Sequence, residues 1–333
     1  MSFFYIQNRR YLGNKFKLVQ SIEKLISNKK INFKSFLDLF SGTGVVANHF
    51  NHKNNKIITN DILKSNKIIL SAFFESKTRP KNLSKKLKYL NSLKDNQENY
   101  ISENYGNKYF SFKNACKIGL IRDRIDEISD NNQEKYILLT SLVYALDKVA
   151  NTVGHYDAYR EVKIDHKPII LKEPFINYIK NMNNEVHSED ANKIINKIKV
   201  DITYIDPPYN SRQYSDCYHL LENLVSWEKP EVYGKAKKMN RSEIKSKYCQ
   251  KEAPHVFDDL IKRINTKYII VSYNNTENSK HGRSNAKISY KQIKSTLEKK
   301  GKIEINKINF KAFTTGKSKT LNHKEVLFYC KTE

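Results

Sequence analysis

A compact group of residues that could do chemistry follows an apolar run in the second half of the chain. The sequence DITYIDPPYNSRQY occupies residues 201–214, and its apolar part ends in Asp206, Pro207, Pro208 and Tyr209. A carboxylate accepts hydrogen bonds, proline fixes its own φ and restricts the residue before it, and a tyrosine ring can stack on a planar ligand. An ordinary turn is the alternative, but the position at the end of a predicted buried strand favours a catalytic site.

A second motif, DLFSGTG, lies in the first part of the chain. It contributes Asp38, Phe40, Gly42 and Gly44, at the end of and just beyond the apolar run 35–40. Glycines allow a sharp turn and the close approach of a ligand, but the spacing matches neither the phosphate-binding loop nor a complete dinucleotide fingerprint. The carboxylate of Asp38 would disfavour a pyrophosphate and suits a cation, such as the amino group of a methionine moiety.

The next apolar run, residues 56–61, ends in an acid, Asp61. A carboxylate at the end of the strand that follows the glycine turn can accept hydrogen bonds from both hydroxyls of a ribose. The two motifs together imply a ligand that has a ribose and an amine but no phosphate, and S-adenosylmethionine fits this description. A simple tight turn of an α/β fold is the alternative interpretation of the glycines.

The order of apolar runs predicts an α/β fold. Short, continuous apolar runs bounded by polar residues are typical of buried parallel strands. Such runs lie at residues 35–40, 56–61, 200–206 and 267–273. Residues 15–28 have helical apolar spacing, and the final pair of runs, 302–310 and 324–330, is expected to form an antiparallel edge hairpin.

The middle of the chain differs from both ends, because it is polar, helix-prone and rich in Lys and Asn. We expect residues 66–180 to form an inserted, mainly helical domain, and residues 1–65 and 181–333 to form the α/β domain. The segment 228–255 is basic and strand-free, and is expected to be a long surface loop or a helical excursion.

Composition limits the possible functions. The chain of 333 residues carries a net charge of +25, which favours a polyanionic partner such as nucleic acid, although the coding bias of an AT-rich genome can also make a protein basic. The four cysteines have no close spacing and no Cys/His cluster, so the sequence predicts no metal site and a reducing cytoplasm. No run of about 18 apolar residues predicts a membrane span, and no signal peptide is recognised at the start.

The order of the motifs resembles that of the Dam-like, alpha-group adenine-N6 DNA methyltransferases, which include companions of restriction enzymes. The segments that carry the resemblance are RRYLGNKFKL, FLDLFSGTG, TNDI and YIDPPYNSRQY. The resemblance covers roughly residues 5–65 and 183–331 and is weaker in between. It implies a Rossmann-like class I S-adenosylmethionine-dependent methyltransferase sheet, with the insert 66–180 as target-recognition domain. It also implies double-stranded DNA as substrate and a cognate restriction endonuclease as a functional partner.

The resemblance gives the first motif a mechanism. The exocyclic amine of adenine is a poor nucleophile, because its lone pair is delocalised into the ring. Asp206 and the carbonyl of Pro207 would accept hydrogen bonds from its two N–H groups, and Tyr209 would stack on a base that has been flipped out of the duplex. No metal and no covalent intermediate is needed, because positioning and electrostatics supply most of the catalysis.

Further roles are carried over residue by residue. We expect Tyr11 to pack on the cofactor, Lys15 to pair with its carboxylate and Asp190 to meet its adenine ring. The complete set of expected cofactor contacts is Tyr11, Lys15, Asp38, Phe40, Gly42, Gly44, Asp61, Asp190 and Asp206. The expected DNA contacts are His155, Tyr156, Tyr159, Arg160, Arg212, Tyr214, Lys280 and Arg283. A solvated surface residue is the alternative for each of the DNA contacts.

Two other functions stay open at this point. The same acidic tip could serve an enzyme that methylates N4 of cytosine or a guanine amine of ribosomal RNA. Cytosine enzymes more often carry Ser in place of Asp206, and the RNA enzymes usually lack a large insert. A non-catalytic nucleic-acid-binding protein of the same fold is the third possibility, but the intact acidic and glycine motifs argue against such decay.

Overall fold

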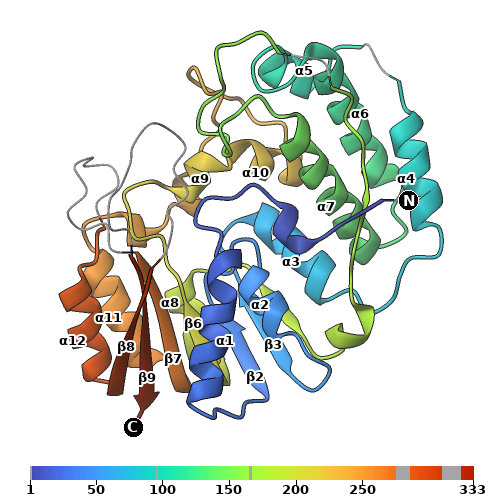
Figure 1. Ribbon diagram of the computed structural model, residues 1–333. Helices are drawn as coiled ribbons and strands as arrows, with labels where there is room; N and C mark the ends of the chain where they lie inside the picture. The colour runs from blue at the N-terminus through green and yellow to red at the C-terminus, as the bar shows by residue number, and fades with distance from the viewer. Residues whose placement is uncertain (1, 95–96, 165–166, 275–285, 310–323) are drawn as a thin grey trace. The chain divides into compact units, whose positions relative to one another are not determined.

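The protein is described by a computed structural model, in which residues 2–94, 97–164, 167–274, 286–309 and 324–333 are placed (Figure 1). The chain divides into two compact units, each built from segments that are distant in sequence. The first unit comprises Met1–Asn14, Leu63–Val186 and Ser215–Glu243. The second unit comprises Lys15–Ile62, His187–Tyr214 and Ile244–Glu333.

A seven-stranded sheet forms the centre of the second unit, with only the start of one edge strand assigned to the first. Its strands are β2 (Ser35–Asp38), β3 (Lys56–Asn60), β5 (Glu185–His187), β6 (Lys199–Ile205), β7 (Asn265–Asn274), β8 (Gly301–Asn309) and β9 (Lys324–Thr332). They are arranged in the order β5-β3-β2-β6-β7-β9-β8. The fold is therefore mixed α/β and consistent with a methyltransferase fold.

The four parallel strands expected from the apolar runs are confirmed as β2, β3, β6 and β7. Strand β2 pairs in parallel with β3 on one side and β6 on the other, and β6 pairs in parallel with β7. The expected antiparallel hairpin of β8 and β9 also forms, but only β8 lies at the edge, because β9 inserts between β7 and β8. Strands buried on both faces read as continuous apolar runs, and Phe36, Leu37 and Ile202 are fully buried.

The helices of the second unit cover the sheet with amphipathic faces (Figure 1). They are α1 (Val19–Asn28), α2 (Val45–Phe50), α8 (Ala191–Ile194), α11 (Ala253–Arg263) and α12 (Tyr290–Glu298). The helix expected at 15–28 starts as the 3-10 turn Phe16–Leu18 and continues as α1, whose buried face contains Val19, Ile22 and Leu25. Apolar residues of α11 and α12 join strand residues of β7 and β9 in one core cluster.

The first unit is mainly helical. Its helices are α3 (Lys64–Phe74), α4 (Leu83–Ser92), α5 (Tyr100–Tyr105), α6 (Phe112–Ile128), α7 (Asn132–Val149) and α10 (His219–Ser226), and the short α9 (Tyr214–Cys217) lies at its boundary. A two-residue strand, β1 (Phe3–Phe4), pairs in parallel with β4 (Glu173–Pro174). Side-chain caps fix several helix starts, for example Asn131, which accepts the backbone N–H of Glu134.

This first unit is larger than the insert expected from the sequence. It also contains the N-terminal residues and the segment Ser215–Glu243. The boundaries 66–180 and the recognition role of the insert stay a prediction.

Short 3-10 turns complete the described structure at Ile6–Asn8, Tyr178–Asn181, Ile195–Lys197, Ser242–Ile244 and Lys247–Cys249. Within the described residues, no helix is both long and apolar enough to cross a membrane.

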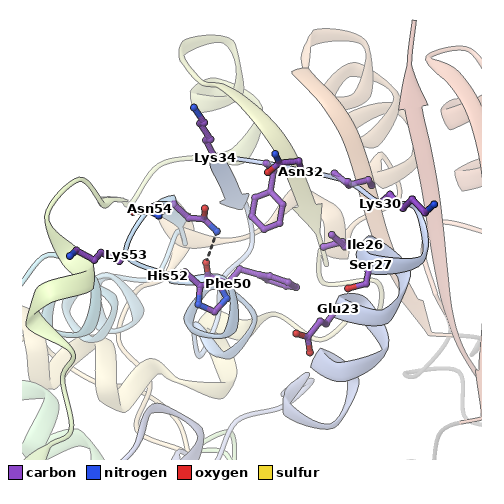
Figure 2. A pocket seen from close by; sticks show the side chains of 13 residues that line it. Glu23, Ile26, Ser27, Lys30, Asn32, Lys34, Phe50, His52, Lys53 and Asn54 are labelled. Atoms are coloured by element: carbon purple, nitrogen blue, oxygen red, sulfur yellow. Dashed lines mark hydrogen bonds between the residues drawn. The ribbon is translucent and has the colours of Figure 1, made fainter.

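A cavity of about 740 Å³ lies in the second unit, at the amino ends of the strands. Figure 2 shows Glu23 and Ser27 of α1 and Phe50 at the end of α2 around it. Lys34, which also lines it, directly precedes β2. Ligands of open parallel sheets bind at the opposite, carboxyl edge, and none of the sequence-predicted site residues lines this cavity.

Candidate active site

The carboxyl ends of the central strands bring the acidic residues of three motifs to one edge of the sheet. Asp38 is the last residue of β2, and Asp61 and Asp206 follow β3 and β6. Because β2 lies between β3 and β6, these three carboxylates occupy neighbouring strand ends. They are close enough to influence one another electrostatically, since Asp61 and Asp206 both raise the pKa of Asp38.

The glycine turn that follows β2 has the backbone conformation that its sequence indicates. Gly42 and Gly44 have φ values of 51° and 75°, which residues with a Cβ adopt only at a cost, and Gly44 caps the start of α2. The turn is fastened to the end of β3: Ser41 donates its N–H to the carbonyl of Asn60 at 2.9 Å, and Gly42 donates to a carboxylate oxygen of Asp61 at 2.9 Å.

Asp38 is a buried acid that pairs with no cation among the described residues. Its side chain is only 1% exposed and accepts one long hydrogen bond, 3.3 Å, from the N–H of Ala47. The pKa of Asp38 is raised to about 8, mainly by burial and also by the nearby Asp206 and Asp61, against the lowering effect of the Ala47 N–H. A positively charged ligand group at this position would reverse the shift, so the site is suited to an amine.

Asp206 forms an ion pair with Lys15 in the second unit. The Lys15 Nζ lies 2.9 Å from Oδ2 of Asp206, and the two side chains are only 12% and 16% exposed. Burial raises the pKa of Asp206, while Lys15 opposes the shift. Burial would lower the pKa of Lys15, but Asp206 and Glu325 raise it above its usual value. The partner observed for Lys15 is thus Asp206, and the expected contact with a cofactor carboxylate stays a prediction.

Tyr209 is anchored at both its ring and its hydroxyl. The side chain is 8% exposed, and the hydroxyl donates a short hydrogen bond to the carbonyl of Ser272 in β7. The ring meets Tyr273 edge to face, with centroids 5.0 Å apart. These contacts fix the ring plane at the end of β6, which is what a stacking platform requires; stacking on a base stays a prediction. Phe40 packs edge to face on Tyr248 in the same unit, at 5.0 Å.

Two polar side chains at this edge form hydrogen bonds that stabilise the fold. Asp190, expected to meet the cofactor's adenine ring, caps α8 by accepting the N–H groups of Asn192 and Lys193 at 2.9 and 3.2 Å. Asn60 was not singled out from the sequence. Its amide donates to the carbonyls of Leu39 and Glu189 at 3.2 and 3.1 Å, so it joins the ends of neighbouring strands. An aspartate before a short helical segment is a capping signal that the sequence did contain.

Tyr11 belongs to an aromatic stack in the first unit. Its ring lies parallel to that of Tyr218, with centroids 4.4 Å apart, and its hydroxyl accepts the amide of Asn66 at 3.0 Å. The guanidinium of the buried Arg9 lies 4.9 Å from the Tyr11 ring centroid. Sequence reasoning did not identify Arg9, Asn66 or Tyr218 as the residues that hold Tyr11. Its contact with the cofactor stays a prediction.

The segment GHYDAYR, residues 154–160, lies in the first unit, and two of its expected DNA-contacting side chains are buried. Tyr156 is 2% exposed and donates its hydroxyl to Asp147 at 2.9 Å, and His155 is 8% exposed. We therefore leave both residues out of the proposed DNA-contacting set. Tyr159 is half-buried and Arg160 exposed, so these two can reach a ligand.

The other expected DNA contacts lie in the second unit or beyond the described residues. Arg212 is exposed, and Tyr214 is half-buried at the start of α9. Lys280 and Arg283 lie outside the described residues.

The fold brings together three potential metal ligands that are far apart in sequence. Ligand atoms of His155, Asp157 and Cys217 lie within 4.8 Å of one another. The sequence shows no close Cys/His spacing, and only folding makes His155 and Cys217 neighbours; the expected absence of a metal site stays a prediction. Asp157 already pairs with Lys238 at 2.5 Å, and a metal cation would have to displace this ammonium, so we assign no metal here.

The comparison with known families agrees with the geometry at the sheet edge. The model of the D12 class N6 adenine-specific DNA methyltransferases matches residues 11–285. The chain belongs to this D12 family. The matched region begins at Tyr11 and includes the glycine turn and the Asp206–Tyr209 corner, but it ends before β8 and β9.

Curated relatives of this D12 chain are modification enzymes. The modification methylase StsI of Streptococcus sanguinis is 34% identical over 96% of this chain and 51% of its own length. The type II methyltransferase M.FokI of Planomicrobium okeanokoites is 35% identical over 79% of this chain and 44% of its own. M.NlaIII of Neisseria lactamica is 32% identical over 94% of this chain and 95% of its own. The chain thus spans about half the length of the first two relatives and nearly all of the third.

Proposed function

We propose that this protein transfers a methyl group from S-adenosylmethionine to N6 of adenine at a specific site in double-stranded DNA, as the modification enzyme of a restriction-modification system. Membership of the D12 family and the similarity to type II modification methyltransferases support the reaction class. The net charge of +25 supports a polyanionic substrate. A cognate endonuclease would be a functional partner.

The observation that carries the proposal is the position of Asp206 and Tyr209 beside the acidic strand ends. Asp206 accepts one N–H of the target amine, and the carbonyl of Pro207, held by the proline ring, accepts the other. Two acceptors favour a pyramidal nitrogen with its lone pair available for attack. Tyr209, fixed by Ser272 and Tyr273, supports the face of the flipped base. The proton that the amine loses on methylation passes first to Asp206.

The residues present suit the cofactor. The buried carboxylate of Asp38, whose pKa is raised to about 8, fits the amino group of the methionine moiety, and Asp61 at the end of β3 fits the ribose hydroxyls. Gly42 and Gly44 leave room for the ligand to approach the backbone. When bound, the cofactor supplies an electrophilic methyl group on a sulfonium, so the protein need not provide a metal or a nucleophile of its own.

We further propose that the helical first unit contributes to target recognition. It presents Tyr159 and Arg160 on its surface in the GHYDAYR segment. A tyrosine ring and a guanidinium are side chains that stack on bases and pair with phosphates.

Tritiated S-adenosylmethionine and duplex DNA test this function, with nucleoside analysis of the labelled base. Label is expected in N6-methyladenosine. Asp206→Asn should lower the single-turnover rate by about 100- to 1,000-fold, the range typical for removal of one preorganised electrostatic contact, while DNA binding survives. Asp258→Asn, at a partly exposed acid of α11 that pairs with Lys299, is the matched control. Label in cytidine or in guanosine of ribosomal RNA, or near-normal turnover of Asp206→Asn, would contradict the proposal.

A further inference from the structure

Glu325 is an acid that the topology brings to the catalytic edge from the far end of the chain. It is the second residue of β9 and lies opposite Asn274, the last residue of β7. Because β9 runs antiparallel to β7, the start of β9 lies at the same edge as the ends of the parallel strands. The family match ends at residue 285, so Glu325 lies beyond it.

The side chain of Glu325 is buried and poorly satisfied. It is only 4% exposed, and its Oε2 has no hydrogen-bond partner within the described residues. The hydroxyl of Ser272 in β7 is near enough to lower the pKa of Glu325, but burying a carboxylate remains costly. An acid at this buried position therefore points to a function beyond packing.

Lys15 connects Glu325 to the catalytic acid. The ammonium of Lys15 contacts Asp206 at 2.9 Å, and the charges of Asp206 and Glu325 both stabilise this ammonium. The charge of Glu325 also acts on two buried phenols at this edge, Tyr204 and Tyr209. The group of one cation and two acids has a net negative charge when all three are ionised, which matches a cofactor that carries an additional positive charge.

We propose that Glu325 is a positioning residue for the methyl transfer: it shares the ammonium of Lys15 with Asp206 and thereby determines how strongly Asp206 accepts the target amine. This inference rests on the proposed function. When Glu325 is ionised, Lys15 is divided between two carboxylates, and Asp206 keeps more negative charge for the amine. When Glu325 is protonated, Lys15 is neutralised by Asp206 alone, and Asp206 becomes the weaker acceptor.

The titration of Glu325 gives this arrangement a pH dependence. The pKa of Glu325 is raised to about 7, because burial and the charge of Asp206 raise it more than Lys15 and the hydroxyl of Ser272 lower it. The groups that face it are Lys15, Asp206, Tyr204 and Tyr209, and the pKa values of the two phenols lie well above the neutral range. The methylation rate should therefore rise with pH through about pH 7 as Glu325 ionises.

The first test is a single-turnover pH profile of the full-length protein on duplex DNA between pH 5.5 and 9, at saturating S-adenosylmethionine so that the titration of Asp38 does not limit binding. Glu325→Gln is expected to lose the rise in rate near neutral pH. Its rate should stay at about the low-pH rate of the unsubstituted enzyme. That rate should lie ~10-fold below the high-pH plateau, the effect expected when one hydrogen-bond acceptor is weakened. Glu304→Gln, an exposed acid on the neighbouring strand β8, is the matched control and should keep the normal profile. A Glu325→Gln profile that still rises normally through neutral pH overturns the proposal.

The second test needs no catalysis. The unsubstituted protein should lose thermal stability as pH rises from about 5 to about 8, because folding must hold a buried acid that ionises. Glu325→Gln should reduce this change in Tm, and an undiminished change would contradict the buried titration. If the protein methylates no adenine but Glu325→Gln still reduces the pH dependence of Tm, the proposed function is refuted, while the buried ionisation of Glu325 beside Lys15 stands. If Glu325→Gln does not fold, Glu325→Asp replaces it: its rate profile should keep a rise with a shifted midpoint, and an unshifted midpoint overturns the inference.

Discussion

The end of β6 and the GHYDAYR segment both contain residues that the sequence predicts to contact ligands, yet the structure gives their side chains different surroundings. Both combine aromatic residues with charged or polar ones. At the end of β6, Asp206 meets Lys15 beside other strand ends that carry acids. In GHYDAYR, Tyr156 is instead a buried hub: its hydroxyl binds Asp147, and its carbonyl accepts a hydrogen bond from Tyr109 and contacts His219.

The difference shows how much of a motif's position follows from the local sequence. A residue that follows a parallel strand lies at the carboxyl edge of the sheet, because all parallel strands end at that edge. A loop among helices has no comparable rule. Its side chains point outward or inward according to which neighbours pack around it, here Tyr109, Asp147 of α7 and His219 of α10.

The largest expected effect tests whether Tyr156 is structural. Tyr156→Ala should lower the free energy of unfolding by about 3–5 kcal/mol, as expected for removing a buried aromatic side chain, and should also leave Asp147 with one donor fewer. Tyr159→Ala, at a half-buried neighbour, is the control and should cost clearly less. Denaturant unfolding measures both. A stable Tyr156→Ala protein with weakened DNA binding would restore the interpretation made from the sequence.

The next prediction concerns the sheet edge and its pH dependence. The pKa of Asp38 is raised to about 8, so the folded protein binds more protons than the unfolded chain between about pH 4 and pH 8, and stability falls as pH rises through this range. A cofactor that carries an ammonium group prefers ionised Asp38. The Kd for S-adenosylhomocysteine should therefore decrease from pH 6 to pH 8, by at most about tenfold per unit.

Asp38→Asn sharpens this prediction. The variant should bind S-adenosylhomocysteine about 100-fold more weakly at pH 8, a loss of about 2.7 kcal/mol, and its binding should lose most of the pH dependence. Calorimetric titration at several pH values measures this, with Asp258→Asn as control. An Asp38→Asn protein that binds as tightly as the parent would show that the glycine-turn motif serves only the fold.

The smallest expected effect is at the surface of the first unit. Arg160 is exposed, and if it contacts a phosphate, Arg160→Ala should weaken DNA binding a few-fold and lower the salt dependence of log K by about one. Arg124, paired with Glu127 on α6, offers a control variant that should change neither quantity. If Arg160→Ala leaves the salt dependence unaltered, the predicted contact between Arg160 and a DNA phosphate is wrong.

Much of the second unit was predictable, because its strands are short apolar runs and its motifs stand at their ends. The helix boundaries were less so: α1 begins after a 3-10 turn at Phe16, where backbone hydrogen bonds, not side-chain spacing, decide the geometry. Lys15 and Asp206 were both identified from the sequence, but their ion pair was not, since two residues so far apart in sequence meet only when the sheet forms.

The sequence by itself determined the order of the strands' apolar runs, the glycine turn and the acids that follow β2, β3 and β6, because these features depend on local periodicity and backbone freedom. Only the tertiary structure decided that β9 runs between β7 and β8 and carries Glu325 to the carboxyl edge of the parallel strands, and that Tyr156 faces inward. Strand insertion and side-chain burial are set by packing between segments that are remote in sequence, and no local pattern encodes them.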